Sequence, residues 1–133
     1  MLNQFKMKTL ITLAMILWAG IAFSQDPTTD KAVKALQTGN SKELASVFAD
    51  NLDLVIEDDN DIRSKDQAEQ IVKKFFEKNA AKGFKINNSG TTPLGLIYRI
   101  GELETANGKF KVEIKLKKVG ENNVISQLEI EKM

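Results

Sequence analysis

The stretch that decides the fold is residues 64–78, SKDQAEQIVKKFFEK. Its apolar residues recur at helical spacing, so they share one stripe of an α-helix. They are Ala68, Ile71, Val72, Phe75 and Phe76. Ser64 is followed three residues later by Gln67, which has the form of a capping box and marks the helix start. The pattern predicts an amphipathic helix whose apolar stripe has to be covered by the rest of the chain.

The sequence after this helix predicts four strands that can provide that cover. In residues 109–117 every second residue is apolar, which is typical of a strand with one buried face. Asn107-Gly108 just before it favours a tight hairpin turn. A second turn at residues 120–123 leads into a last strand over residues 124–131, and earlier strands are expected around residues 84–86 and 96–105.

The strand over residues 96–105 changes its alternation partway. Leu96, Tyr98 and Ile100 keep one parity, whereas Leu103 and Thr105 take the other. A β-bulge shifts parity by one residue and is common at glycine, so we expect a bulge at Gly101-Glu102. On this interpretation Tyr98 faces inward.

The sequence before the central helix predicts two short helices and a strand. Residues 30–38 form the first helix, capped by Thr29 or Asp30 and ended by Gly39, after a polar tail that contains Pro27. A second helix, capped by Asn40 or Ser41, places three apolar residues on one face: Leu44, Val47 and Phe48. Alternation over residues 52–57 predicts a strand, followed by a turn at residues 57–61 and a short return strand at residues 62–63.

This order of elements is α+β, with helices first and a hairpin-connected sheet last. It predicts a cone-like curved antiparallel sheet packed on a long helix, with two shorter N-terminal helices. Residues 1–24 are expected to be a cleaved signal peptide, with Lys6 and Lys8 before an apolar run that ends at Ala22-Phe23-Ser24. The run is shorter than the roughly 20 residues that span a bilayer, so no stable membrane anchor is expected after cleavage. The remaining residues 25–133 form a single domain that is exported to the periplasm or the medium.

Composition excludes several classes of function. The chain has no cysteine and no histidine, which removes thiol nucleophiles, histidine-dependent triads and Cys/His metal sites. Loss of Lys6 and Lys8 leaves 17 basic and 18 acidic side chains, a balance without general attraction to nucleic acid. No cofactor is expected. The acidic residues 57–61 lack the glycine and glutamate of a calcium loop, so they predict a solvated turn and no metal site.

The element order and several short segments resemble the nuclear-transport-factor-2-like superfamily of cone-shaped domains. More closely, the chain resembles a family of exported bacterial proteins within that group, which is known as a domain of unknown function. The residues that carry the resemblance include Gly39-Asn40-Ser41, Ser64-Lys65-Asp66-Gln67-Ala68, Phe75-Phe76, Tyr98-Arg99-Ile100-Gly101 and the Asn107-Gly108 turn. The superfamily uses the cone as a pocket in isomerases, dehydratases, cyclases and hydrolases, and also in non-catalytic binders.

Four inward-facing residues are the pocket candidates, namely Phe76, Tyr98, Phe110 and Ile114. An isomerase-like site would also need an inward carboxylate, and the nearest options are Asp53, which alternates outward, and Glu102 at the suspected bulge. Lysines at positions 109, 111, 115 and 117 predict a solvated strand face, with weak docking on an anionic surface as the alternative.

Three functions follow from this pattern. The first is a non-catalytic module that binds a small apolar molecule in the cone. The second is a homodimeric interaction or structural protein of the cell envelope. The third is a carboxylate-based isomerase or hydrolase, which the composition favours least.

Overall fold

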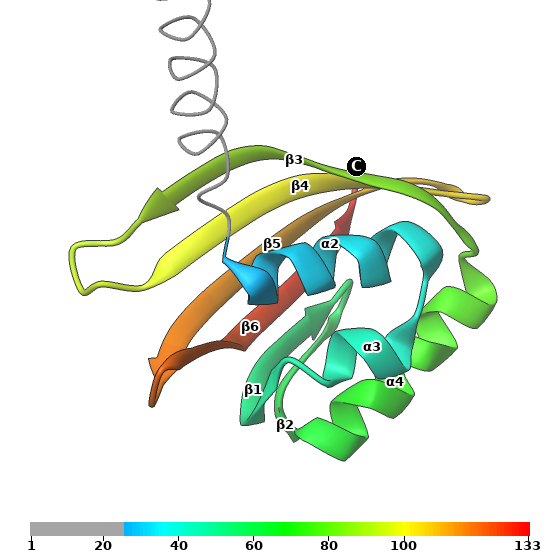
Figure 1. Cartoon of the computed structure of the whole chain (residues 1–133). Helices are drawn as coiled ribbons and strands as arrows, with labels where there is room; N and C mark the ends of the chain where they lie inside the picture. Colours follow the sequence, from blue (N-terminus) through cyan, green and yellow to red (C-terminus); the bar gives the residue numbers. More distant parts are fainter. Residues whose placement is uncertain (1–25) are drawn as a thin grey trace, which may run out of the picture.

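Six strands form one curved sheet, and three helices cover one of its faces (Figure 1). The computed structural model describes residues 26–133. The elements in chain order are α2 (Pro27–Thr38), α3 (Ser41–Ala45), β1 (Phe48–Ile56), β2 (Asp59–Ser64), α4 (Lys65–Lys78), β3 (Ala81–Thr91), β4 (Ile97–Thr105), β5 (Gly108–Val119) and β6 (Asn122–Lys132). The α+β class and the curved sheet on helices are confirmed, whereas the expected signal peptide lies outside the described residues.

The strand order is β2-β1-β6-β5-β4-β3, which leaves β2 and β3 at the edges. All neighbouring strands are antiparallel except β1 and β6, which pair in parallel. The sheet is therefore mixed rather than wholly antiparallel. This parallel pair joins the first strand to the last, a long-range contact that alternation within either strand does not reveal.

The central helix begins and ends as its sequence predicts. The Ser64 hydroxyl accepts from the Gln67 N–H, and the Ser64 N–H donates to the Gln67 side chain, both at 3.3 Å, which is a complete capping box. Its last turn is fastened to the β4–β5 hairpin, because the Asn107 side-chain amide donates to the carbonyl oxygen of Lys78 at 2.7 Å. Helix and hairpin are thus held in a fixed relation at one end of the sheet.

The first helix starts earlier than the sequence pattern indicates. Asp26, not Thr29 or Asp30, is its N-cap, and Pro27 occupies the first turn. The Asp26 carboxylate accepts from the Thr28 N–H at 2.9 Å and from the Thr29 hydroxyl at 2.6 Å. Proline suits the first turn because its missing N–H would have no helical partner there, so the predicted polar tail is in fact helix. Gly39 ends the helix in a left-handed conformation, as expected.

The segment after α3 is strand where helix was expected. Phe48 opens β1, and Val47 lies between the two elements. Asn40 caps the short helix through its side chain, which accepts from the Glu43 N–H at 3.1 Å. On the other side of β1 the turn is shorter than predicted, since Asp59 already pairs with Ile56 and the return strand runs over six residues.

The cap at Asp26 predicts a pH-dependent contribution to stability. Burial raises the pKa of the Asp26 carboxyl, but hydrogen bonds from Thr29 and Thr28 outweigh it and hold the pKa below its ordinary value of 3.8. Because the folded pKa is depressed, the carboxylate stabilises the fold above pH 3.8, and this contribution is lost as the pH falls through the lower folded pKa. Asp26→Ala should lower the free energy of unfolding by about 1 kcal/mol at neutral pH, as loss of an N-cap does.

Urea unfolding at pH 7 and in acid measures this effect. The difference in unfolding free energy between Asp26→Ala and the wild type should be smaller in acid. Asp50→Ala, which removes an exposed carboxylate of β1, should change the unfolding free energy little at either pH. A deficit of Asp26→Ala that stays the same in acid would contradict the role of the charged cap.

Candidate functional site

The inner face of the sheet, which the helices cover, is mostly filled by its own side chains. Phe110 and Ile114 on β5 are 1% and 3% exposed, and Leu128 on β6 is fully buried. These residues belong to one hydrophobic core with α2, α3 and α4. The structure therefore places the two predicted pocket residues of β5 in the packed core.

Phe76 lies in the same core but reaches its edge. Its ring packs edge-to-face on Phe75 with the centroids 5.4 Å apart, and Phe75 packs in the same way on Phe110 at 5.1 Å. Phe76 is 8% exposed and lines an open groove of about 470 Å³ between α4 and the α2–α3 junction. The structure thus links Phe76 to Phe110 through Phe75.

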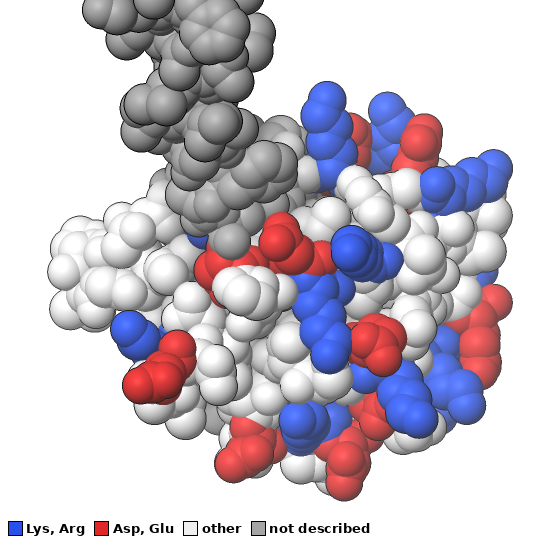
Figure 2. Space-filling model, in the orientation of Figure 1, with Lys and Arg blue, Asp and Glu red and all other residues white. Residues whose placement is uncertain are grey.

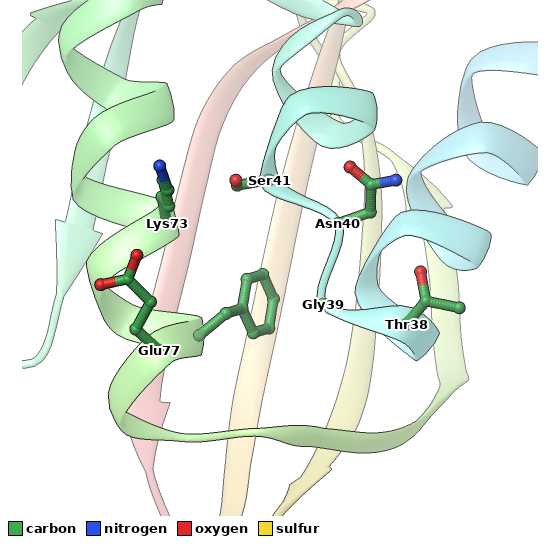
Figure 3. A pocket seen from close by; sticks show the side chains of 7 residues that line it. Thr38, Gly39, Asn40, Ser41, Lys73 and Glu77 are labelled. Atoms are coloured by element: carbon green, nitrogen blue, oxygen red, sulfur yellow. The ribbon is translucent and has the colours of Figure 1, made fainter.

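That groove is polar on its flanks. Figure 3 shows Lys73 and Glu77 on α4, across the groove from Ser41 at the start of α3. Gly39 forms part of its wall close to the Phe76 ring, because a Cβ at Gly39 would lie 3.3 Å from that ring. Lys73 and Glu77 are exposed to solvent. An open, charged groove of this kind differs from the enclosed apolar pocket that small apolar ligands prefer.

Tyr98 faces outward, so the predicted inward orientation is wrong. It pairs with Lys115 of β5 in a register that runs without a shift from Ile97 to Thr105. The register shifts lie in β3 instead, between Ala81 and Gly83 and between Ile86 and Asn88. Tyr98 therefore shares the outer face with the lysines of β5, and its ring covers Gly90 of β3, where a Cβ would collide with it.

The corrected register brings a different residue to the inner face. Arg99 shares its parity with Gly101 and Leu103, and directly opposite residues of an antiparallel pair point to the same side. Ser89 on β3 and Ile114 on β5 are its direct neighbours. Arg99 was not among the predicted site residues, because the alternation pattern indicates a bulge in β4. Continuing the parity of Leu103 and Thr105 backward along the strand would have found it.

Burial falls off toward one corner of this inner face. Along β4 the inner residues Leu103 and Thr105 are buried, whereas Ile97 and Arg99 are half-buried. Across the sheet, Ser89 and Thr91 on the edge strand are exposed, while Ile114 and Leu116 are buried. We define the open corner as Ser89, Thr91, Ile97 and Arg99.

Two hydrogen bonds explain why the helices within residues 26–133 leave this corner uncovered. The Thr28 hydroxyl at the start of α2 donates to the carbonyl of Asn123 on β6 at 2.7 Å, and Gln37 near its end donates to the carbonyl of Phe84 on β3 at 3.3 Å. The helix therefore crosses the inner face diagonally from β6 to β3. In Figure 1 the β3–β4 hairpin projects past the beginning of α2. The last residues of β3 and the first of β4 thus extend beyond the helical cover.

The strand residue with a shifted pKa, Glu129, lies on the outer face. A side-chain hydrogen bond with Glu131 raises the pKa of Glu129, together with partial burial and the negative charges of Glu131 and Glu113. Glu129 alternates with the buried residues Leu128 and Ile130, so it points to the outer face. Asp53 and Glu102, the two carboxylates considered for a catalytic base, also lie outside, opposite Ile62 and Lys111 respectively.

Two ion pairs link charged side chains of the outer face. Lys109 pairs with Glu102 at 3.7 Å and Lys115 with Glu113 at 4.0 Å, as expected for a solvated strand face. In Figure 2 charges of both signs are spread over the face in view, except on the lobe where Figure 1 places the β3–β4 hairpin. Residues 86–98 of this hairpin contain no charged side chain. Within residues 26–133, no group of three or more acidic side chains is placed to hold a metal ion, and no helix has the length and hydropathy to cross a bilayer.

Solved structures match the chain in sequence and in fold. A protein from Bacteroides ovatus is 33% identical, covers 77% of this chain and 93% of its own, and superposes with a TM-score of 0.73. A protein from Bacteroides uniformis is also 33% identical, with coverages of 78% and 95% and a TM-score of 0.73. Both are described as DUF4783 family proteins.

Lower-identity matches share the fold alone. A candidate polyketide cyclase from Sinorhizobium meliloti is 9% identical, covers 80% of this chain and 95% of its own, and has a TM-score of 0.61. The six-stranded curved sheet with its helices is therefore the cone of nuclear-transport-factor-2-like folds, which designed proteins of this type also adopt. No curated protein matches the chain.

The family assignment rests on nearly the whole described region. The model of the domain of unknown function DUF4783 matches residues 29–131, which include five strands, all but the last residue of β6 and most of α2. The chain therefore belongs to the DUF4783 family.

Proposed function

We propose that this protein is an exported, non-catalytic member of the nuclear-transport-factor-2-like superfamily that binds a small, mainly apolar molecule at the open corner of its cone. The observation that carries the proposal is the change in burial along β4. Ile97 continues the apolar inner face beyond the helices, yet it is only half-buried. Apolar surface that adjoins a packed core and stays uncovered is typical of a binding site.

The partner of Ile97 on β5 joins this site to the apolar core. Leu116 lies directly opposite Ile97 and is 1% exposed, and Ile97 itself packs against the core. Because Ile97 already packs against the core, binding at this corner would need little further ordering of that side chain.

The proposal excludes catalysis for chemical reasons. The chain has no histidine or cysteine, and the register places Tyr98, Asp53 and Glu102 on the outer face. A carboxylate-based isomerase would need its base and its hydrogen-bond donor on the side of the substrate. The charged side chain on the inner face at the open corner is Arg99, whose guanidinium carries N–H donors and no acceptor and so offers no base.

A homodimer is the second candidate, and the edge of the sheet favours it. β3 is an edge strand, and Leu94 at the tip of the uncharged β3–β4 hairpin is 92% exposed. An uncharged, exposed edge can pair with a second copy without charge repulsion. The lysine-rich outer face of β5 is less suited to this contact.

A native mass spectrum of the protein, exported by a bacterial host and not refolded, tests these proposals. We expect a chain that begins at Gln25 and carries extra mass that is lost on denaturation. A bare monomer would contradict ligand binding, and a bare dimer would favour the second candidate. A full-length mass would contradict export with signal cleavage.

A further inference from the structure

We propose that Arg99 makes the open corner selective for a carboxylate, so that the ligand is a small amphipathic carboxylic acid. This inference rests on the proposed function and names the chemical class of its ligand. The carboxylate would bind the guanidinium, and the apolar part would lie on Ile97 toward α2.

The guanidinium of Arg99 has no acidic partner in its own chain. None of the ion pairs within 4.0 Å among the described residues includes it. All 18 Asp and Glu residues of the sequence lie in the described part, because residues 1–25 contain none. The other arginine, Arg63, pairs with Asp59 at 3.1 Å and with Asp61 at 3.9 Å. Arg99 is thus a half-buried arginine without a counter-ion.

Most of its hydrogen-bonding capacity is also free for a ligand. Among the described residues its one side-chain hydrogen bond runs from Nη1 to the carbonyl oxygen of Tyr98, at 3.0 Å. A guanidinium carries five N–H donors in a planar fork that matches the two oxygens of a carboxylate. Such charge-assisted, two-point contacts are among the strongest hydrogen bonds in proteins.

The positions around Arg99 define the rest of the ligand. Ser89 lies directly opposite on the edge strand and supplies a hydroxyl on the same face. Ile97 follows on the inner face of β4, and the buried Ile114 and Leu116 lie beside Arg99 and Ile97 on β5. The site thus has one positive group, one hydroxyl and adjoining apolar side chains. This combination suits a singly charged, amphipathic acid better than a phosphate, which would need more positive charge.

Calorimetric titration of the mature chain with octanoate and with 1-octanol tests this inference. The two probes share an apolar tail and differ in the charged group. We expect octanoate to bind more tightly than 1-octanol, and Arg99→Gln to weaken octanoate binding by about ten- to a hundredfold while leaving 1-octanol binding unchanged. Arg63→Gln, the matched control at the far edge of the sheet, should bind both probes like the wild type.

Ser89→Glu provides a second test that leaves Arg99 in place. A glutamate opposite Arg99 would supply the missing counter-ion, so octanoate binding should be lost while 1-octanol binding remains. Both variants alter a side chain outside the packed core, and equal melting temperatures would show that the fold is intact.

The outcomes separate this inference from the proposed function. If octanoate and 1-octanol bind equally and Arg99→Gln changes neither, the corner binds apolar molecules but the carboxylate inference is wrong. If neither probe binds, both the proposed function and the inference are contradicted.

Discussion

Phe110→Ala is expected to lower the free energy of unfolding by about 3–5 kcal/mol, as large aromatic truncations in a core do. Phe110 is 1% exposed and packs edge-to-face on Phe75 with a centroid distance of 5.1 Å. It also pairs with the fully buried Leu103 across the sheet. Removing the ring leaves a cavity that α4 and β4 together cannot close, because the hairpin and the helix end are tied through Asn107.

Denaturant unfolding followed by circular dichroism measures this loss. The loss of unfolding free energy caused by Phe76→Ala should lie at the lower end of the same range, since Phe76 is 8% exposed and borders the groove at α3. Ile62→Ala is the control, because Ile62 is 70% exposed on the edge strand β2 and should change stability by less than about 0.5 kcal/mol. If a phenylalanine variant kept its stability but lost a bound ligand, that ring would be a pocket wall and not core.

Elements defined by their own sequence could be predicted, as α4 and β5 illustrate. The stripe of α4 and its capping box are local signals, and so is the alternation that buries Phe110 and Ile114. Prediction failed where contacts between segments distant in sequence determine the structure. Phe48 follows a helical pattern in sequence, but it lies in β1 because β1 pairs with β6 at the other end of the chain.

The error at the candidate site has the same origin. Both faces of β4 carry apolar or aromatic residues. On the outer face, the ring of Tyr98 covers Gly90 of the neighbouring strand. Alternation along β4 alone therefore cannot tell which side is inner. The choice depends on where the bulge lies, and the structure has it in β3. Because β4 has no bulge, Arg99 and not Tyr98 lies on the inner face. The candidate site therefore lies at the open corner and not in the core.

Gly101→Val is expected to destabilise the protein by about 2–3 kcal/mol, through overpacking of a filled core. Gly101 pairs with Ile86 in β3 and lies on the inner face, where the Phe84 ring occupies the space that a side chain would need. A Cβ at this position would lie 2.5 Å from Cζ of Phe84 and 2.6 Å from the backbone oxygen of Lys85. The ring could turn only into the core, and the backbone oxygen belongs to the paired strand. Moving either of them would therefore cost free energy.

Gly83→Val is the matched control for this substitution. Gly83 lies on β3 beside β4, and a Cβ there would meet no atom within 4 Å. Valine should therefore be tolerated at Gly83 within about 0.5 kcal/mol, because its strand propensity offsets any small loss. Comparing the two variants by thermal and denaturant unfolding separates the cost of the contact from the general effect of replacing a strand glycine. Equal stabilities would mean that the Phe84 ring is not held over Gly101, and that the parity of β4, on which the position of Arg99 depends, must be assigned anew.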